Sequence, residues 1–151
     1  MKKYVKTSLV SCSVEELFEF HLDSNNIKKI TPQDTKVELL NKDFVPEEGE
    51  ILEIKTTKFC LPIFWAVEIS LIKKPNMLVD TALSSPFDFW RHSHIFTKKG
   101  NVCELKDVVE YELPFGVIGN IFYSLIEKQL DNMFTYRHKQ TKIILEKKDK
   151  A

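Results

Sequence analysis

The sequence predicts an α+β fold, in which a bent antiparallel sheet of about seven strands wraps around a long C-terminal helix. Two short helices are expected after the first strand. Three observations support this fold class. Apolar and polar residues alternate with a period of two through most of residues 35–113, as in half-buried strands. No helical segment interrupts that stretch, which favours antiparallel pairing. Beyond Ile118, apolar residues recur at intervals of three and four, the spacing of one helical face.

The first elements have clear start and stop signals. Residues 3–12 alternate β-branched and polar side chains and predict the first strand. Ser13 follows with Glu16 three positions later, a capping box that begins a short helix. The segment SNNIKKITP predicts a second helical turn that ends before Pro32, since proline disfavours helical geometry in the residue before it.

The remaining elements complete a single expected domain, residues 1–151, because no linker, repeat or low-complexity segment divides the chain. Six strands are expected at residues 35–40, 50–59, 64–74, 77–83, 89–98 and 102–113, with turns that include Glu48-Gly49, Leu61-Pro62 and Gly100-Asn101. After Pro114, the apolar stripe predicts a helix from about Val117 to about Glu146, about 30 residues long.

Composition excludes several classes of function. The 22 basic and 22 acidic residues give no net charge, so no nucleic-acid partner is expected. Cys12, Cys60 and Cys103 show no CxxC spacing, which favours reduced thiols in a cytoplasmic protein. No apolar run approaches the length of a transmembrane span, and the N-terminus lacks the apolar stretch of a signal peptide.

The segment FWRHSHIFTKKGNVCELKDVVEYELPFG contains the densest group of chemically active residues. If residues 98–101 form the hairpin loop, Thr97 pairs with Val102, and His92 then lies directly opposite Asp107. A slip of one residue would place apolar side chains against charged ones, so the pattern selects this register. The inward face is then predicted to contain Trp90, His92, His94, Phe96, Cys103, Leu105, Asp107, Val109, Tyr111 and Leu113.

Three interpretations of His92 and Asp107 remain open. They form a structural pair that satisfies two buried polar groups, or part of a pocket wall that orients the polar head of a ligand. The third is a metal site of two histidines and a carboxylate. It is the least favoured, since no further strong ligand is evident, and neither a metal nor a cofactor is expected. Cys103 shares the face but lies too far from His92 for nucleophilic catalysis.

The segment DFWRHSHIFTKKGNVCELKDVVEYELPFGVIGNIF resembles a recurring segment in bacterial members of the SRPBCC superfamily, which includes START-like and polyketide-cyclase-like helix-grip proteins. The N-terminal SVEELFEFHLDSNNIKKITP is similar to the start of such a domain, so the resemblance covers nearly the whole chain. It implies a helix-grip fold, with an apolar ligand held between the sheet and the long helix. It implies no catalytic residues, because the superfamily shares none.

The leading hypothesis is therefore a protein that binds a hydrophobic or amphipathic small molecule, such as a lipid, a polyketide or an isoprenoid-like compound. Aromatic and aliphatic residues line the expected cavity, and three polar residues orient the ligand. The expected ligand-binding residues are Trp65, Val67, Ile69, Trp90, His92, His94, Phe96, Leu105, Asp107, Val109, Tyr111, Phe122, Ile126 and Met133. Phe64, Phe87, Phe89 and Phe115 are expected near the cavity mouth, partly exposed.

Two alternatives belong to other classes. One is an enzyme of cyclase or dehydratase type, in which His92 and Asp107 act as an acid–base pair. The other is a lipid-delivery or interaction protein whose aromatic mouth contacts a membrane surface or a protein partner.

Overall fold

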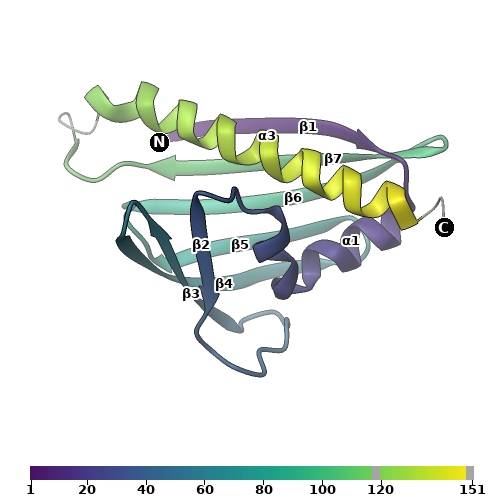
Figure 1. The fold of residues 1–151 in the computed structure, drawn as a ribbon, viewed down its shortest axis with the longest axis horizontal. Helices are drawn as coiled ribbons and strands as arrows, with labels where there is room; N and C mark the ends of the chain where they lie inside the picture. Colours follow the sequence, from purple (N-terminus) through teal and green to yellow (C-terminus); the bar gives the residue numbers. More distant parts are fainter. Residues whose placement is uncertain (117–119, 149–151) are drawn as a thin grey trace.

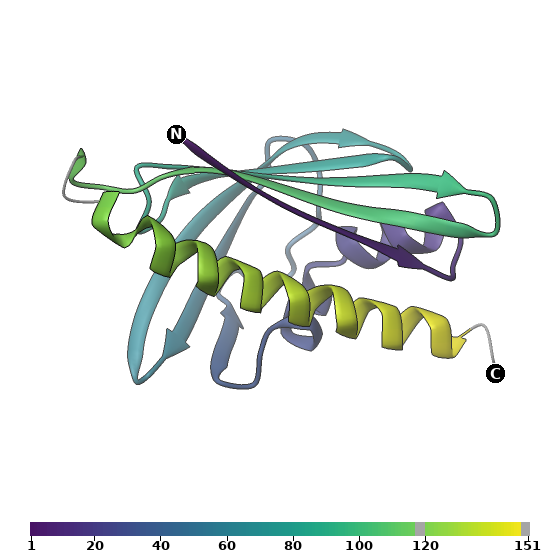
Figure 2. The same ribbon diagram turned by 90° about the horizontal axis from the view of Figure 1, so that it is seen from above.

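The computed structural model describes residues 1–116 and 120–148, and it confirms the predicted α+β class. One curled antiparallel sheet has the strand order β1-β7-β6-β5-β4-β3-β2, and the long helix α3 crosses its concave side (Figures 1 and 2). The strands are β1 (Lys2–Val10), β2 (Thr35–Leu39), β3 (Ile51–Lys58), β4 (Leu61–Lys73), β5 (Met77–Ser84), β6 (Phe89–Lys99) and β7 (Val102–Glu112). The helices are α1 (Val14–Leu22), the 3₁₀ helices η1 (Ser24–Ile30) and η2 (Asn120–Phe122), and α3 (Tyr123–Lys148).

The expected capping box is present at the start of α1. The Ser13 hydroxyl accepts a hydrogen bond from the backbone N–H of Glu16 at 3.1 Å, and the Glu16 carboxylate accepts one from the backbone N–H of Ser13 at 2.9 Å. Two of the backbone donors at this helix end are thereby satisfied. Asp23 then caps η1, because its carboxylate accepts a hydrogen bond from the backbone N–H of Asn25.

The predicted register of the β6–β7 hairpin was wrong by two residues, although the predicted face was correct. Lys99 pairs with Val102 across a two-residue turn, so His94 rather than His92 lies opposite Asp107. Gly100 occupies this turn with φ +60°, a conformation that short hairpin turns require and glycine adopts without strain. The loop therefore has two residues rather than the four assumed from the sequence. Because the register shifts by an even number of residues, each side chain stays on its predicted face.

The turn between β3 and β4 also differs from its prediction. Leu61 and Pro62, expected in the turn, belong to β4 and pair with Lys58 and Thr57. The turn itself consists of Phe59 and Cys60, with φ angles of +51° and +61°. Neither is a residue that favours this left-handed region, so the sequence carried no signal for a turn there.

Curvature and packing position α3 against the sheet. The pairing of β4 with β5 shifts register at Ala66/Val67 and Ile69/Leu71, and such bulges or irregularities bend a strand. The predicted helix start near Val117 lies outside the described residues. Residues 120–122, expected within the helix, form the 3₁₀ helix η2, so α3 runs from Tyr123 to Lys148, two residues beyond its predicted end. No helix in the described part of the chain has both the length and the apolar character needed to cross a membrane.

Two apolar clusters hold α3 at separate points along its length. One cluster lies beside α1 and includes Phe18, Phe96 and, from α3, Leu145. The other lies beneath the first half of α3 and includes Tyr111 together with Phe134 of the helix. A polar network occupies the space between them, and it borders the candidate functional site.

Candidate functional site: a cavity beside a histidine–aspartate network

A cavity of about 500 Å³ lies between the concave face of the sheet, η1 and α3. This volume falls within the range of about 300–1,000 Å³ that is typical of small-molecule sites. Strands β2 to β6 form its wall, and its apolar side chains include Leu52, Trp65, Val67 and Trp90. Its polar side chains include His92 and His94, as expected for a site that fixes the orientation of an apolar ligand.

Eight of the fourteen expected ligand-binding residues line this cavity: Trp65, Val67, Ile69, Trp90, His92, His94, Ile126 and Met133. The other six do not. Phe96, Leu105, Asp107, Val109 and Tyr111 are buried beneath α1 and α3, in the core or the polar network, and Phe122 is 52% exposed on the outside. The expected mouth residues Phe64 and Phe115 are exposed, and Phe87 and Phe89 are partly exposed. Only Phe87 of these four lines the cavity.

Asp107 is the centre of the polar network. The residue is 3% exposed, and its carboxylate accepts a hydrogen bond from Nε2 of His92 at 2.8 Å through Oδ1. Nδ1 of His94 lies 2.9 Å from the same oxygen, as an ion pair whose angle is poor for a hydrogen bond. The second oxygen, Oδ2, lies 2.7 Å from Nε2 of His138. Three imidazoles therefore surround one buried carboxylate, which requires such partners.

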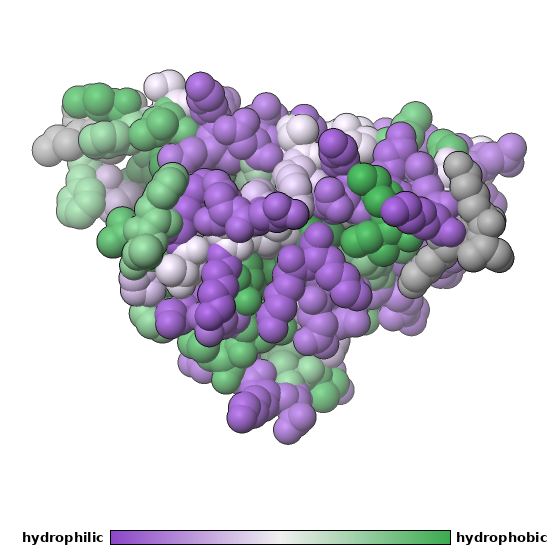
Figure 3. All heavy atoms as spheres, viewed as in Figure 1, coloured by the Kyte–Doolittle hydropathy of each residue, from purple (hydrophilic) through white to green (hydrophobic). Residues whose placement is uncertain are grey.

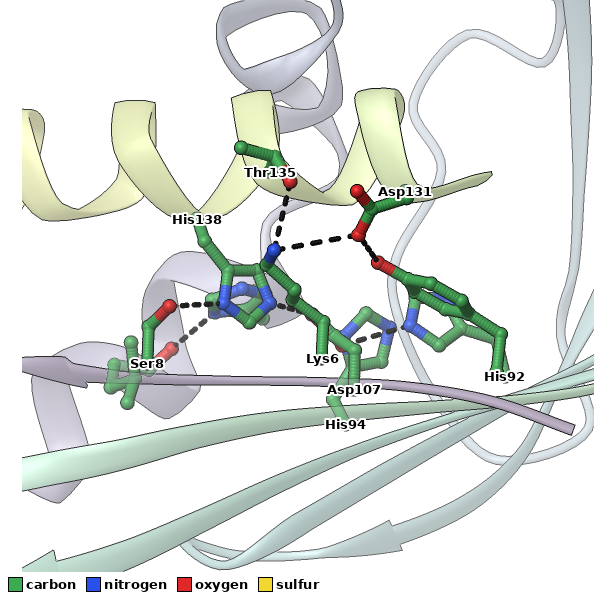
Figure 4. Close-up of polar contacts among 11 residues, drawn as sticks. Lys6, Ser8, His92, His94, Asp107, Asp131, Thr135 and His138 are labelled. Atoms are coloured by element: carbon green, nitrogen blue, oxygen red, sulfur yellow. Dashed lines mark hydrogen bonds and ion pairs between the residues drawn. The ribbon is translucent and has the colours of Figure 1, made fainter. Parts of the chain in front are cut away.

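His138 joins the C-terminal helix to the sheet through this network. Its ring points from α3 toward Asp107 on β7 and Ser8 on β1 (Figure 4). Nδ1 of His138 lies 2.7 Å from the Ser8 hydroxyl. Farther along the same strand, Lys6 donates to the hydroxyl of Thr135 at 2.8 Å and Tyr4 donates to the carboxylate of Asp131, also at 2.8 Å, so β1 and α3 are joined at several points.

All four histidines of the chain meet at this place. Nε2 of His94 lies 3.1 Å from a carboxylate oxygen of Asp80 on β5, which extends the network to the cavity wall. The ring of His21, from α1, lies 5.4 Å from that of His94, and its Nδ1 lies 2.8 Å from the Leu17 carbonyl oxygen.

The network favours a positive charge on His94. Burial opposes this charge, but Asp107 and then Asp80 outweigh burial and raise the pKa of His94 to about 9. Burial lowers the pKa of His92 to about 4, assisted by the charge of His94, whose ring centroid is only 3.9 Å away. Burial likewise lowers the pKa of His21 to about 3. Burial acts to raise the pKa of Asp107, yet the surrounding histidines hold it well below its usual range.

A metal ion has a possible ligand set here, although its composition differs from the one considered from the sequence. Asp80, His92 and His94 present ligand atoms within 4.8 Å of one another, so the carboxylate is Asp80 rather than Asp107. Two imidazoles and a carboxylate suit ions such as Zn²⁺ or Fe²⁺. An ion would first have to separate the hydrogen bond between His94 and Asp80.

Sequence reasoning missed many residues of this site, and its polar members include Ser8, His21, Asp80, Arg137 and His138. Ser8 and Asp80 lie in correctly predicted strands, but their partners are distant in sequence. Arg137 does carry a local signal, because it continues the helical spacing of three and four through Ile126, Leu130, Met133 and Arg137, all of which line the cavity.

Comparison with known proteins supports the fold and leaves the function open. No family model and no curated protein matches the chain. Among solved structures, a Chromobacterium violaceum protein has a TM-score of 0.77 at 11% identity, over 95% of this chain and 96% of that one. Norcoclaurine synthase from Thalictrum flavum has a TM-score of 0.76 at 12% identity, over 98% and 96%. A START superfamily protein from Mycobacterium smegmatis has a TM-score of 0.69 at 12% identity, over 96% and 97%.

These matches define the class of fold. The chain has the helix-grip fold of START-like proteins, so the resemblance seen in the sequence is confirmed at the level of fold. Identities of 11–12% carry no information about shared ligands or reactions.

Proposed function

We propose that this protein binds a hydrophobic or amphipathic small molecule in the cavity between the sheet and α3. The observation that carries the proposal is the cavity itself: about 500 Å³ with mostly apolar walls, beside a network that supplies a few fixed polar groups. Structural matches to a START superfamily protein support the proposal by analogy of fold alone.

Titration with Nile red, a neutral apolar dye, tests the proposal. We expect saturable binding of the dye to the native protein. A matched pair of variants, one inside the cavity and one outside it, then locates the bound dye. Ile126→Glu places a carboxylate in the cavity wall and should weaken binding at least about tenfold, because an unpaired buried charge is strongly unfavourable. Phe122→Glu, four residues earlier, changes an exposed side chain outside the cavity and should leave binding unchanged.

Two results of the dye measurements would contradict the proposal. Absence of saturable binding by folded wild-type protein would remove the basis of the proposal. Equal weakening by both variants would place the dye on the outer surface. Circular dichroism of each variant verifies that folded proteins are being compared.

A second candidate is catalysis by proton transfer. His92 lines the cavity, and Asp107 accepts a hydrogen bond from its far side at 2.8 Å, the arrangement of an oriented general base. The lowered pKa of His92, about 4, keeps its imidazole neutral at pH 7. Turnover of a bound ligand that is lost in His92→Gln, with ligand affinity retained, would favour this candidate over binding alone.

A third candidate, lipid delivery, would use a different surface of the protein. Phe115, Ile121, Phe122 and Leu125 are all more than half exposed, and apolar side chains gather at the end of the molecule where α3 begins (Figure 3). Co-sedimentation with liposomes, lost when Phe115 and Ile121 are both replaced by serine, would support contact with a membrane surface.

A further inference from the structure

Arg137 is a cation in the cavity wall that has no counter-ion among the described residues. It follows Ile126, Leu130 and Met133 on the face of α3 that lines the cavity. Its Nε is fully buried and makes no hydrogen bond, and no carboxylate of the described residues lies within ion-pair distance of its guanidinium. The guanidinium carbon lies 5.4 Å from the centroid of the Phe134 ring, a cation–π contact.

The carboxylates that line the same cavity already have partners. Asp80 is bound to His94 at 3.1 Å, and Asp34 forms an ion pair with Lys58, also at 3.1 Å. The Asp23 carboxylate accepts a hydrogen bond from the backbone N–H of Asn25 at 3.0 Å. Arg137 is thus left as the cation without a partner in this lining, among the residues that the structure describes.

We propose that Arg137 binds the carboxylate head of an amphipathic ligand whose apolar tail fills the cavity. This inference rests on the proposed function and specifies its ligand class. A planar guanidinium pairs with a carboxylate through two parallel hydrogen bonds, which fixes both the position and the orientation of the head. The tail then extends along the apolar wall formed by Trp65, Val67 and Trp90.

Charge and burial favour an anionic head over a neutral one. A partly buried cation is costly unless it is paired, and burial lowers the pKa of Arg137 despite the opposing fields of Asp107 and Asp80. A bound carboxylate removes that cost. Asp80 and Asp107 both contact His94, at 3.1 Å and 2.9 Å, and neither lies within ion-pair distance of Arg137.

The test compares ligands that differ only in the head group. Nile red bound to wild-type protein is displaced with dodecanoic acid, dodecanol or dodecyl phosphate. We expect dodecanoic acid to displace the dye at a concentration about 10- to 100-fold lower than dodecanol, the range expected for a charge-assisted hydrogen-bonded pair. Equal potency of acid and alcohol would overturn the inference, and a phosphate at least tenfold more potent than the acid would overturn the assignment of a carboxylate.

Variants assign the effect to one side chain. Arg137→Gln should remove the preference for the acid and leave dodecanol unchanged, whereas Arg137→Lys should retain part of the preference. Lys139→Gln, which removes a cation from an exposed position on the same helix, is the control and should change neither. Equal loss of acid and alcohol binding in Arg137→Gln would show that Arg137 only shapes the cavity. Failure of wild-type protein to bind Nile red or dodecanol would refute the proposed function instead, and the wild-type comparison needs no variant to fold.

Discussion

Replacing Asp107 with leucine removes the one acceptor that three imidazoles share. The hydrogen bonds from His92 and His138, at 2.8 Å and 2.7 Å, lose their acceptor, and His94 loses one of its two carboxylates. Removing one partner of a buried ionic group costs about 3–5 kcal/mol. Domains are stable by only about 5–15 kcal/mol, so Asp107→Leu should lose a large fraction of the free energy of unfolding.

Asp107→Asn keeps the shape of the side chain and removes its negative charge. Its amide oxygen still accepts from His92, and its NH₂ group can donate to Nε2 of His138 if that ring adopts its other tautomer. The expected cost of Asp107→Asn is therefore smaller, about 1–3 kcal/mol, from hydrogen bonds that lose the assistance of a charge. Binding of Nile red should change little in the folded Asn variant, because Asp107 does not line the cavity.

Urea denaturation at pH 7 measures both variants. With an m-value of about 1–3 kcal/mol per molar urea, the leucine variant should lower the midpoint by about 1 M or more. Asp131→Asn is the control: this exposed aspartate also joins β1 to α3, through Tyr4 and Lys6, and its loss should cost less than about 1 kcal/mol. An Asp107→Leu protein within about 1 kcal/mol of wild type, or a control that costs as much, would show that the network does not hold α3 to the sheet.

Two further predictions concern stability. Folding stability should be greatest near pH 6.5, the ordinary pKa of histidine. The pKa of His94 is about 9, so the folded state binds the proton of His94 more tightly than the unfolded state does. The resulting contribution to the free energy of unfolding is complete below about pH 6.5. It is lost as pH rises toward 9, at about 1 kcal/mol per pH unit. The pKa values of His92 and His21, about 4 and about 3, make stability fall as pH drops from about 6.5 toward 4, and urea midpoints that stay flat from pH 4 to 9 would contradict this reasoning. Cys60→Gly should stabilise the protein by about 1 kcal/mol, because Cys60 has φ +61° in a two-residue turn, a backbone conformation that glycine adopts without strain. Calorimetry should show a rise in Tm of about 2–4 °C. An unchanged or lower Tm would show that Cys60 is not strained in this turn.

The hairpin of β6 and β7 shows what sequence periodicity determines and what it leaves open. Alternation placed His92, His94 and Asp107 on one face correctly, because a wrong face would have buried charged residues. The pairing within that face depended on turn length, and loops of two and four residues around Gly100 satisfy the same alternation. Periodicity cannot separate registers that differ by two residues, so the partner of Asp107 had to come from the structure.

The candidate site was predictable only in part, for a related reason. The cavity wall follows from the strands, which explains why Trp65, Val67 and Trp90 were anticipated. His138 comes from α3 instead, so its contact with Asp107 depends on the curvature of the sheet and the crossing of α3. Those quantities arise from bulges and long-range packing, and neither leaves a local pattern in the sequence.

The convergence of all four histidines has a spectroscopic consequence. Because no imidazole lies elsewhere in the chain, every ring-nitrogen signal from protein labelled with ¹⁵N-histidine originates at the network beside the cavity. Two-bond nitrogen–proton correlations distinguish the tautomers and the charged ring directly, and the chain needs no mutation to isolate them. A candidate ligand added to such a sample would then reveal, in the signals of four rings free of background, whether it reaches the polar wall or remains among the apolar side chains.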